Sequence, residues 1–328
     1  MLRTFERCVF LTFLLTATVC AGATPNHMES IAVSPDGKFI AVTYEKNHTR
    51  FIYKIAVDSG IASRLTDAKT GEESSPSFSA DGKQIAYSYW PGKGEHFRIV
   101  IQNIDGSNSH TWSPSDADDF RPLFSPDTKT IIFARSRYYG NYSPIASPSY
   151  HAWDFYAANL DGTNMRQLTR ESFYMVSAAS VSSDGKNMAV VTEGLDTPEQ
   201  IAIYSLDHPE KPAQSLRPHV PRGADPKNPI FNCPNYMPDG KSILFMAATN
   251  GRHGYDYDVY RLDLGTGAVD RLTNGNGYAT DLRVFADGKT AAFLKWRSDW
   301  RSTPVESSLY LLDVQTHTAT SLKVTGLD

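Results

Sequence analysis

The stretch Phe78-Ser-Ala-Asp-Gly-Lys-Gln-Ile-Ala-Tyr87 decides the fold of this chain, because versions of it recur along the whole sequence. Its centre favours a tight turn, since Asp81 can bond its own backbone and Gly82 accepts a positive φ. Apolar residues alternate before the turn, which is typical of a strand with one buried face. The continuous apolar run at residues 85–87 predicts a second strand that is buried on both faces.

Six copies of this turn follow one another at intervals of 45–57 residues. Their aspartates are Asp36, Asp81, Asp127, Asp184, Asp239 and Asp287. A second half-motif follows each copy: an apolar-Tyr strand, an aspartate turn, and often Arg-x-Leu-Thr. Its aspartates are Asp58, Asp105, Asp161, Asp207, Asp263 and Asp313. Each repeat of about 50 residues therefore predicts four short strands, a to d.

Four-stranded sheets that repeat radially are the blades of a propeller. We therefore predict an all-β, six-bladed β-propeller of four-stranded antiparallel blades, a single domain over residues 24–328. A linear solenoid is the alternative, but its periods and capping repeats fit less well.

Residues 1–23 have the pattern of a secretory signal peptide. Arg3 and Arg7 precede the apolar run at residues 8–19, and Ala21-Gly22-Ala23 provides a small-residue cleavage site. The run is short for a membrane span of about 20 residues. We expect cleavage after Ala23, a periplasmic or secreted location, and no transmembrane segment in the mature chain. An uncleaved anchor and a lipoprotein modified at Cys20 are the alternatives.

After cleavage Cys233 would be the remaining cysteine, and we expect it to be free and packed.

Composition excludes several classes of protein. Hydrophobic residues make up 41% of the chain and charged residues 21%, so a disordered chain is excluded. The net charge is -4, and no stretch is strongly basic, so we expect no nucleic-acid partner.

The strings at residues 78–87 and 161–169 (Asp-Gly-Thr-Asn-Met-Arg-Gln-Leu-Thr) resemble the WD40-like PD40 repeat of TolB-type propellers. The resemblance covers essentially residues 28–324. It implies a periplasmic propeller that binds a protein in the cell envelope; in that family the partner is the peptidoglycan-associated lipoprotein. Similar repeats form the propellers of oligopeptidase-type enzymes and of some sugar lyases. The chain departs from TolB in lacking an α/β domain before the propeller, and from the oligopeptidases in lacking a G-x-S-x-G nucleophile elbow.

The irregular segments predict where a ligand binds. Turns a–b and c–d are regular and fall on one face, so the b–c loops and the links between blades share the opposite face, which we call the top face. The longest b–c loops belong to blades three and six, which stand opposite each other in a ring of six. They predict an elongated cleft whose aromatic walls suit a sugar face or a peptide side chain. The walls are Tyr139, Tyr142, His151 and Trp153 on one side and Trp296, Arg297 and Trp300 on the other.

Two charged residues are expected at the pore beneath this cleft. Arg121 and Asp281 each stand six residues before the turn aspartate of their blade, and the arginine suits a carboxylate. The alternative for the aromatic residues is that they pack the insertions onto their own blades.

Chemical motifs are sparse. Histidines are scattered over several blades with no H-x-H or H-x-x-x-H pair, so we expect no metal site and no cofactor. We expect a binding or scaffolding module for a protein or cell-envelope partner, to which a glycan or peptide ligand would also fit. The alternative is a carbohydrate-active or other small-substrate lyase or hydrolase, with its site in the channel mouth.

Overall fold

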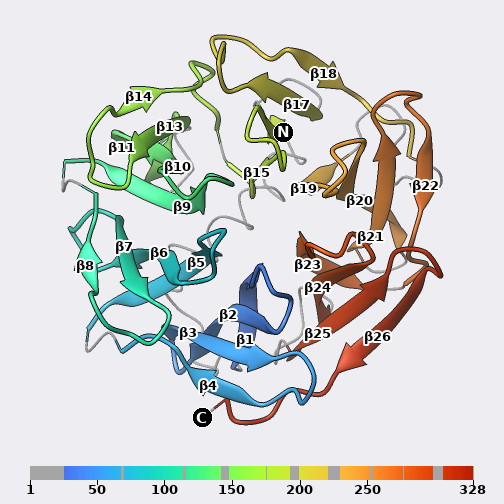
Figure 1. Ribbon diagram of the computed structural model, residues 1–328, viewed down its shortest axis with the longest axis horizontal. Helices are drawn as coiled ribbons and strands as arrows, with labels where there is room; N and C mark the ends of the chain where they lie inside the picture. The colour runs from blue at the N-terminus through green and yellow to red at the C-terminus, as the bar shows by residue number, and fades with distance from the viewer. Residues whose placement is uncertain are drawn as a thin grey trace.

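Six blades surround a central axis in the computed structural model (Figure 1). The structure describes residues 26–67, 70–113, 116–141, 148–174, 176–192, 199–220, 230–251, 254–275, 277–297 and 306–327. Among these residues, no helix is long and apolar enough to cross a membrane. Each blade is a four-stranded antiparallel sheet, so the predicted fold class is confirmed.

The strands follow the repeat in chain order. Blade one contains β1 (His27–Val33), β2 (Phe39–Lys46), β3 (Thr49–Ala56) and β4 (Ala62–Arg64). Blade two contains β5 (Glu72–Phe78), β6 (Gln84–Trp90), β7 (Arg98–Asn103) and β8 (His110–Thr111). Blade three contains β9 (Asp118–Phe124), β10 (Thr130–Ser136), β13 (Asp154–Asn159) and β14 (Arg166–Gln167), with an additional hairpin of β11 (Tyr138–Gly140) and β12 (Ser149–His151).

The second half of the ring repeats the pattern. Blade four contains β15 (Ser180–Val181), β16 (Asn187–Thr192), β17 (Gln200–Ser205) and β18 (Gln214–Leu216). Blade five contains β19 (Phe231–Tyr236), β20 (Ser242–Gly251), β21 (Gly254–Asp263) and β22 (Val269–Arg271). Blade six contains β23 (Tyr278–Val284), β24 (Thr290–Arg297), β25 (Glu306–Asp313) and β26 (Thr318–Leu322).

The repeated aspartate holds each a–b turn. In blade one, Asp36 Oδ1 accepts hydrogen bonds from Ser34 Oγ (2.7 Å) and from the Lys38 backbone N–H (3.1 Å). The turn aspartates of the other five blades accept the same bond from the lysine two residues later. Blade three has Thr128 where the others have glycine, and Thr128 takes the same positive φ (58°). The six turns are therefore equivalent, as the repeat predicts.

The innermost strands bulge at one shared position. Ser75, Arg121, Cys233 and Asp281 all have a φ between 43° and 54°, and the pairing of their strands shifts register there. A bulge re-aims a side chain and frees backbone N–H groups for other partners. In these four blades they are the residues that the sequence places six positions before the turn aspartate, so the bulges occupy equivalent positions around the axis.

Apolar clusters between neighbouring blades hold the disc together. Most clusters draw on two consecutive blades. Between blades six and one, for example, Leu294 and Leu309 pack in the same cluster as Ile40 and Ile55. All four of these side chains are fully buried. Burying one such side chain contributes about 1.5–3 kcal/mol, so the inter-blade clusters are the main source of stability.

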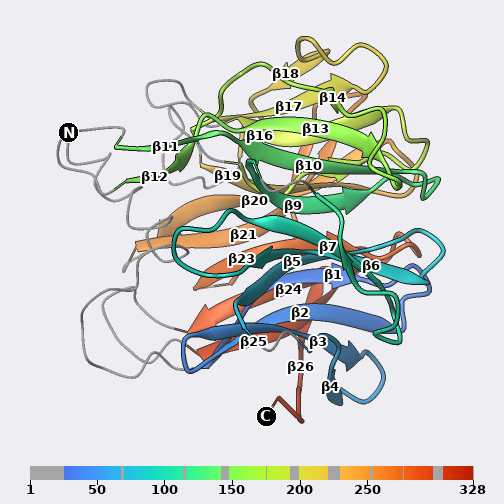
Figure 2. The same ribbon diagram turned by 90° about the vertical axis from the view of Figure 1, so that its left-hand side faces the viewer.

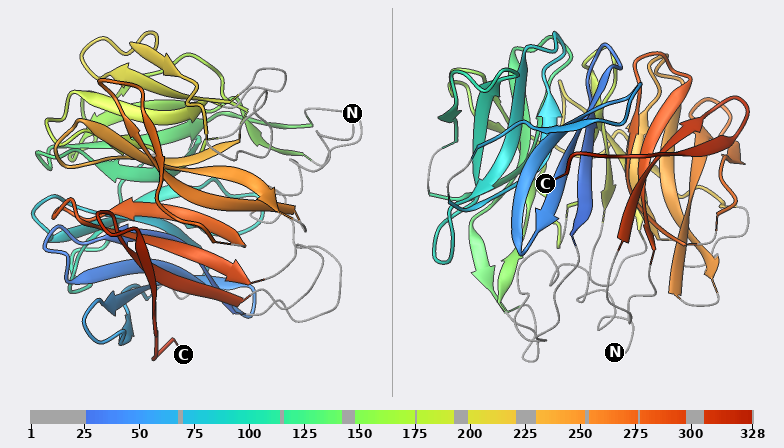
Figure 3. Two further views of the ribbon diagram at one scale, coloured as in Figure 1. Left: turned by 90° about the vertical axis from the view of Figure 1, so that its right-hand side faces the viewer. Right: turned by 90° about the horizontal axis from the view of Figure 1, so that it is seen from below.

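The ring closes without exchanging a strand between its ends. Blade one and blade six are each built from one continuous segment, and the chain after β26 runs along the outer edge of blade one (Figure 3). There the Ala62 N–H donates to the Thr325 carbonyl (2.8 Å), and the Thr325 N–H donates to the Gly60 carbonyl (3.0 Å). Gly60 is required by this approach, because a Cβ on it would lie 2.0 Å from the Lys323 carbonyl oxygen.

Candidate functional site

The β11–β12 hairpin projects from the top face of blade three (Figure 2). Its strands pair Tyr138 with His151 and Tyr139 with Tyr150. The rings of the same residues are in contact, edge-on for Tyr138 and His151 (centroids 4.5 Å apart) and tilted for Tyr139 and Tyr150 (4.8 Å apart). Tyr138 and Tyr139 nevertheless remain 51% and 59% exposed, which leaves an aromatic ring open to solvent on each face of the hairpin.

The base of the hairpin is buried. Trp153 is 6% exposed, its indole N–H donates to the Tyr150 carbonyl (3.2 Å), and its ring packs near Phe120. Ser136 Oγ donates to the His151 carbonyl at 2.7 Å. Trp153 therefore anchors the insertion to its blade and does not offer its ring to a cleft, whereas Tyr139 is exposed on the hairpin and its place in a cleft stays a prediction. Tyr142 lies outside the described residues.

The opposite wall is described only in part. Trp296 is half-buried, and its ring packs edge-on against His27 (5.0 Å) and Tyr278 (5.9 Å). It therefore lies at the junction of blades six and one. Arg297 ends β24, and Trp300 lies outside the described residues, so the predicted cleft remains a prediction.

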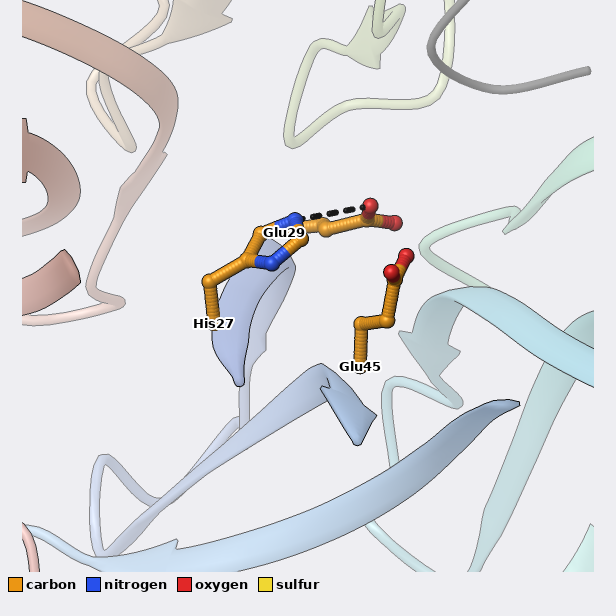
Figure 4. Close-up of side chains that lie close together, drawn as sticks. All are labelled: His27, Glu29 and Glu45. Atoms are coloured by element: carbon orange, nitrogen blue, oxygen red, sulfur yellow. Dashed lines mark hydrogen bonds and ion pairs between the residues drawn. The ribbon is translucent and has the colours of Figure 1, made fainter. Parts of the chain in front are cut away.

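A polar cluster that the sequence analysis missed surrounds Arg50 at the top ends of blades one and two. His27 Nε2 donates to Glu29 (3.2 Å), and Glu45 lies beside that pair (Figure 4). Arg50 donates to both oxygens of Glu29 (2.8 and 3.1 Å), to Glu45 (2.6 Å) and to Glu72. Burial by itself raises the pKa of Glu29, but the hydrogen bond from His27 and the charge of Arg50 lower it to about 2.

This cluster contains a donor set that a cation could use, since ligand atoms of His27, Glu29 and Glu45 lie within 4.8 Å of one another. The set fits a cation poorly, however, because the guanidinium of Arg50 already occupies the centre and both carboxylates already accept hydrogen bonds from it. The arrangement is an ion-pair network that joins blades one and two.

A second polar pair lies between blades two and three. His96 Nδ1 donates to Asp118 Oδ2 (2.8 Å), and the Phe97 backbone N–H donates to Asp118 Oδ1 (2.8 Å). Asp118 is fully buried, and this burial raises the pKa of its carboxyl group, whereas the side chain of His96 is 42% exposed. A buried carboxylate that orients an accessible imidazole is an arrangement suited to proton transfer.

The two predicted pore residues differ in their surroundings. Arg121 lines a central cavity of about 160 Å³ together with Arg283. Asp281 is buried just outside it and forms an ion pair with Arg283 at 2.6 Å. Burial lowers the pKa of Arg121, and the charge of Asp281 only partly offsets that effect.

Known proteins share this architecture, although no protein-family model matches the chain. Dipeptidyl-peptidase 5 from Porphyromonas gingivalis is 26% identical over 320 residues, which cover 83% of this chain and 45% of the peptidase. The Tol-Pal system protein TolB from Francisella tularensis is 33% identical over 81 residues, or 25% of this chain and 18% of that protein. The solved structure of TolB from Acinetobacter baumannii matches with a TM-score of 0.60 at 16% identity, covering 97% of this chain and 67% of that one.

The chain is a six-bladed β-propeller that shares its fold with the solved TolB structure. An oligogalacturonate lyase in complex with manganese has the same fold, with a TM-score of 0.59 at 14% identity and coverage of 90% and 77% of the two chains. At these identities the solved structures establish the fold alone. The propeller also spans less than half the length of the peptidase that it matches.

Proposed function

We propose that this TolB-like propeller is a secreted or periplasmic binding module that docks a protein or cell-envelope partner on its top face. The observation that carries the proposal is the exposed pair Tyr138 and Tyr139 on the β11–β12 hairpin. Aromatic side chains are enriched at the centres of protein interfaces, where they supply most of the binding energy.

The hairpin is organised before any partner binds. Ring contacts with His151 (edge-on) and Tyr150 (tilted) support both exposed rings, and Trp153 fixes the base of the hairpin. A rigid loop loses little conformational entropy when it binds, so more of the contact energy becomes affinity. The signal-like residues 1–23 and the TolB relatives support an envelope location for this role.

The alternative is an enzyme that acts on a carbohydrate or another small substrate. His96 and Asp118 favour it, because a buried carboxylate holds an accessible imidazole in one orientation. The match to a peptidase over 83% of this chain and the fold shared with a lyase support the same alternative. In that case His96→Ala should abolish turnover of a sugar or peptide library while leaving partner capture intact.

Affinity capture from an envelope extract tests the binding proposal. The purified chain is compared with a Tyr138→Ser/Tyr139→Ser variant, and captured proteins are identified by mass spectrometry. Ile61→Ser is the matched control, since Ile61 is equally exposed (60%) but lies in a c–d connection on the opposite face. We expect the double variant to lose a partner that the wild type and the control both retain. Equal capture by all three would contradict the proposal.

A further inference from the structure

The central cavity is built by inner strands that converge on the axis. Blades one, two, three, four and six all contribute to its lining, mostly with small or apolar side chains such as Ser75 and Ala178. Arg121 and Arg283 are the charged residues among those that line it. A volume of about 160 Å³ is roughly ten times the minimum that one water molecule needs, so the cavity can hold a small organic group.

Arg121 enters this cavity without a carboxylate of its own. Its Nε is buried and has no hydrogen-bond partner within the described part of the chain, and no carboxylate oxygen of that part lies within 4.0 Å of its guanidinium. The bulge at Arg121, with a φ of 54°, directs the side chain, and the backbone N–H bonds to Ser88 Oγ (3.0 Å) in blade two. The position of Arg121 is therefore fixed by the fold. Its guanidinium lies over the Phe120 ring, 5.3 Å from the centroid, and the charge of Asp281 only partly offsets the effect of burial.

The nearest carboxylate is already in use. Asp281 accepts hydrogen bonds from the N–H groups of Ile31 (2.8 Å) and Leu282 (3.0 Å), and from Arg283 Nη1 (2.6 Å). Asp281 is thus paired with Arg283, and among the described residues the guanidinium of Arg121 has no carboxylate at ion-pair distance. Burying an unpaired charge raises the free energy of the folded state. An anion that binds beside Arg121 would lower it again.

We propose that the central cavity is a carboxylate-binding site in which Arg121 and Arg283 hold the anion. The planar guanidinium forms two parallel hydrogen bonds with a carboxylate, which suits the free donors of Arg121. Burial disfavours the charged form of Arg121, as the lowered pKa of the residue indicates, and a bound anion reverses that effect. The carboxylate can come from a free small acid or from an acidic side chain that a partner inserts, because both present the same group to the two arginines. The proposed site does not depend on which partner binds the top face.

Calorimetric titration and thermal unfolding of the purified chain test the site. The probes are sodium acetate, sodium succinate, and a capped Ala-Glu-Ala peptide with its Ala-Gln-Ala counterpart, each against sodium chloride at equal ionic strength. We expect at least one carboxylate probe to raise the melting temperature above its chloride or glutamine control. Binding of the free acids identifies a small acid as the ligand. Binding of the glutamate peptide alone identifies an inserted side chain.

Variants locate the site. Arg121→Gln should weaken binding by about tenfold or more, since a charge-assisted hydrogen bond is worth about 1.5–3 kcal/mol. Arg121→Lys, which keeps the charge but loses the fork, should bind with intermediate affinity, and the exposed Arg170→Gln should match the wild type. Without ligand, Arg121→Gln should be no less stable than the wild type, which a purely structural role for Arg121 would not allow. A wild type that responds equally to carboxylates and chloride overturns the proposal whether or not the variants fold. Undiminished binding by Arg121→Gln overturns it equally.

Discussion

Asp281 in blade six accepts a hydrogen bond from the backbone N–H of Ile31 in blade one, with 2.8 Å between Asp281 Oδ2 and the Ile31 nitrogen. Both residues are buried, and 250 positions separate them in the chain. At other junctions a serine hydroxyl accepts the backbone hydrogen bond from the next blade. Ser30 Oγ accepts from the Ser75 N–H, and Ser180 Oγ accepts from the Tyr236 N–H. The closing junction of the propeller therefore uses a carboxylate in the same role.

Removing that carboxylate should loosen the ring. Asp281→Ala leaves a buried N–H of Ile31 and the guanidinium of Arg283 without their partner, which should lower the free energy of unfolding by about 3 kcal/mol. Urea unfolding measures the loss. Asp313→Ala, in an exposed c–d turn of the same blade, is the control and should change stability far less. Similar losses in both variants would show that the Asp281–Ile31 contact does not close the ring.

The outer closure should depend on Gly60. Gly60→Ala would place a Cβ 2.0 Å from the Lys323 carbonyl oxygen, so the segment at residues 323–326 would have to move away. Gly106→Ala is the matched control, because Gly106 also has a positive φ (85°) but has open space around it. The control should lose only about 1–2 kcal/mol of stability, because alanine is strained in the left-handed backbone conformation. Hydrogen exchange at the Thr325 amide should accelerate in Gly60→Ala alone; equal exchange in both variants would contradict this closure.

The blade three insertion should separate stability from binding. Trp153→Ala leaves a buried cavity and should lower the free energy of unfolding by about 3–5 kcal/mol. Tyr139→Ala removes an exposed ring and should keep that free energy within about 0.5 kcal/mol of the wild type. Thermal and urea unfolding of the two variants give the comparison. If Tyr139→Ala were as destabilising as Trp153→Ala, the exposed ring would be part of the scaffold and not of an interface.

The ion-pair network around Arg50 should make part of the stability of the protein sensitive to acid. The pKa of Glu29 is lowered from 4.5 to about 2, so folding favours its charged form. Its contribution to stability is complete above pH 4.5 and is lost as the pH falls toward 2. The stability difference between the wild type and Glu29→Gln should therefore shrink over that window. A difference that stays constant from pH 6 to pH 2 would show that Glu29 titrates normally.

The repeated turns and strands could be predicted from the sequence because local rules set them. A Ser-x-Asp-Gly turn binds its own backbone, and a period of two decides which face of a strand is buried, so the blades follow from neighbours in the chain. Arg121 could be placed at the pore for the same reason, since the turn aspartate fixes its register.

The polar contacts between blades could not be predicted in this way. Glu29, Arg50 and Glu72 come from different strands of two blades and meet only when the ring is formed. The available signal was their shared position at the top ends of strands, where acidic residues recur in consecutive blades. Trp153 and Tyr139 belong to one aromatic insertion, and only packing decides that one ring is buried and the other exposed.

Site-specific photo-crosslinking in envelope extract tests most directly the claim that a partner docks on the top face. One variant carries the crosslinking amino acid at Tyr139 and the other at Ile61, two similarly exposed positions on opposite faces. The proposed function predicts a covalent adduct with a defined partner at Tyr139 and none at Ile61. An adduct at Ile61 with none at Tyr139 would contradict it.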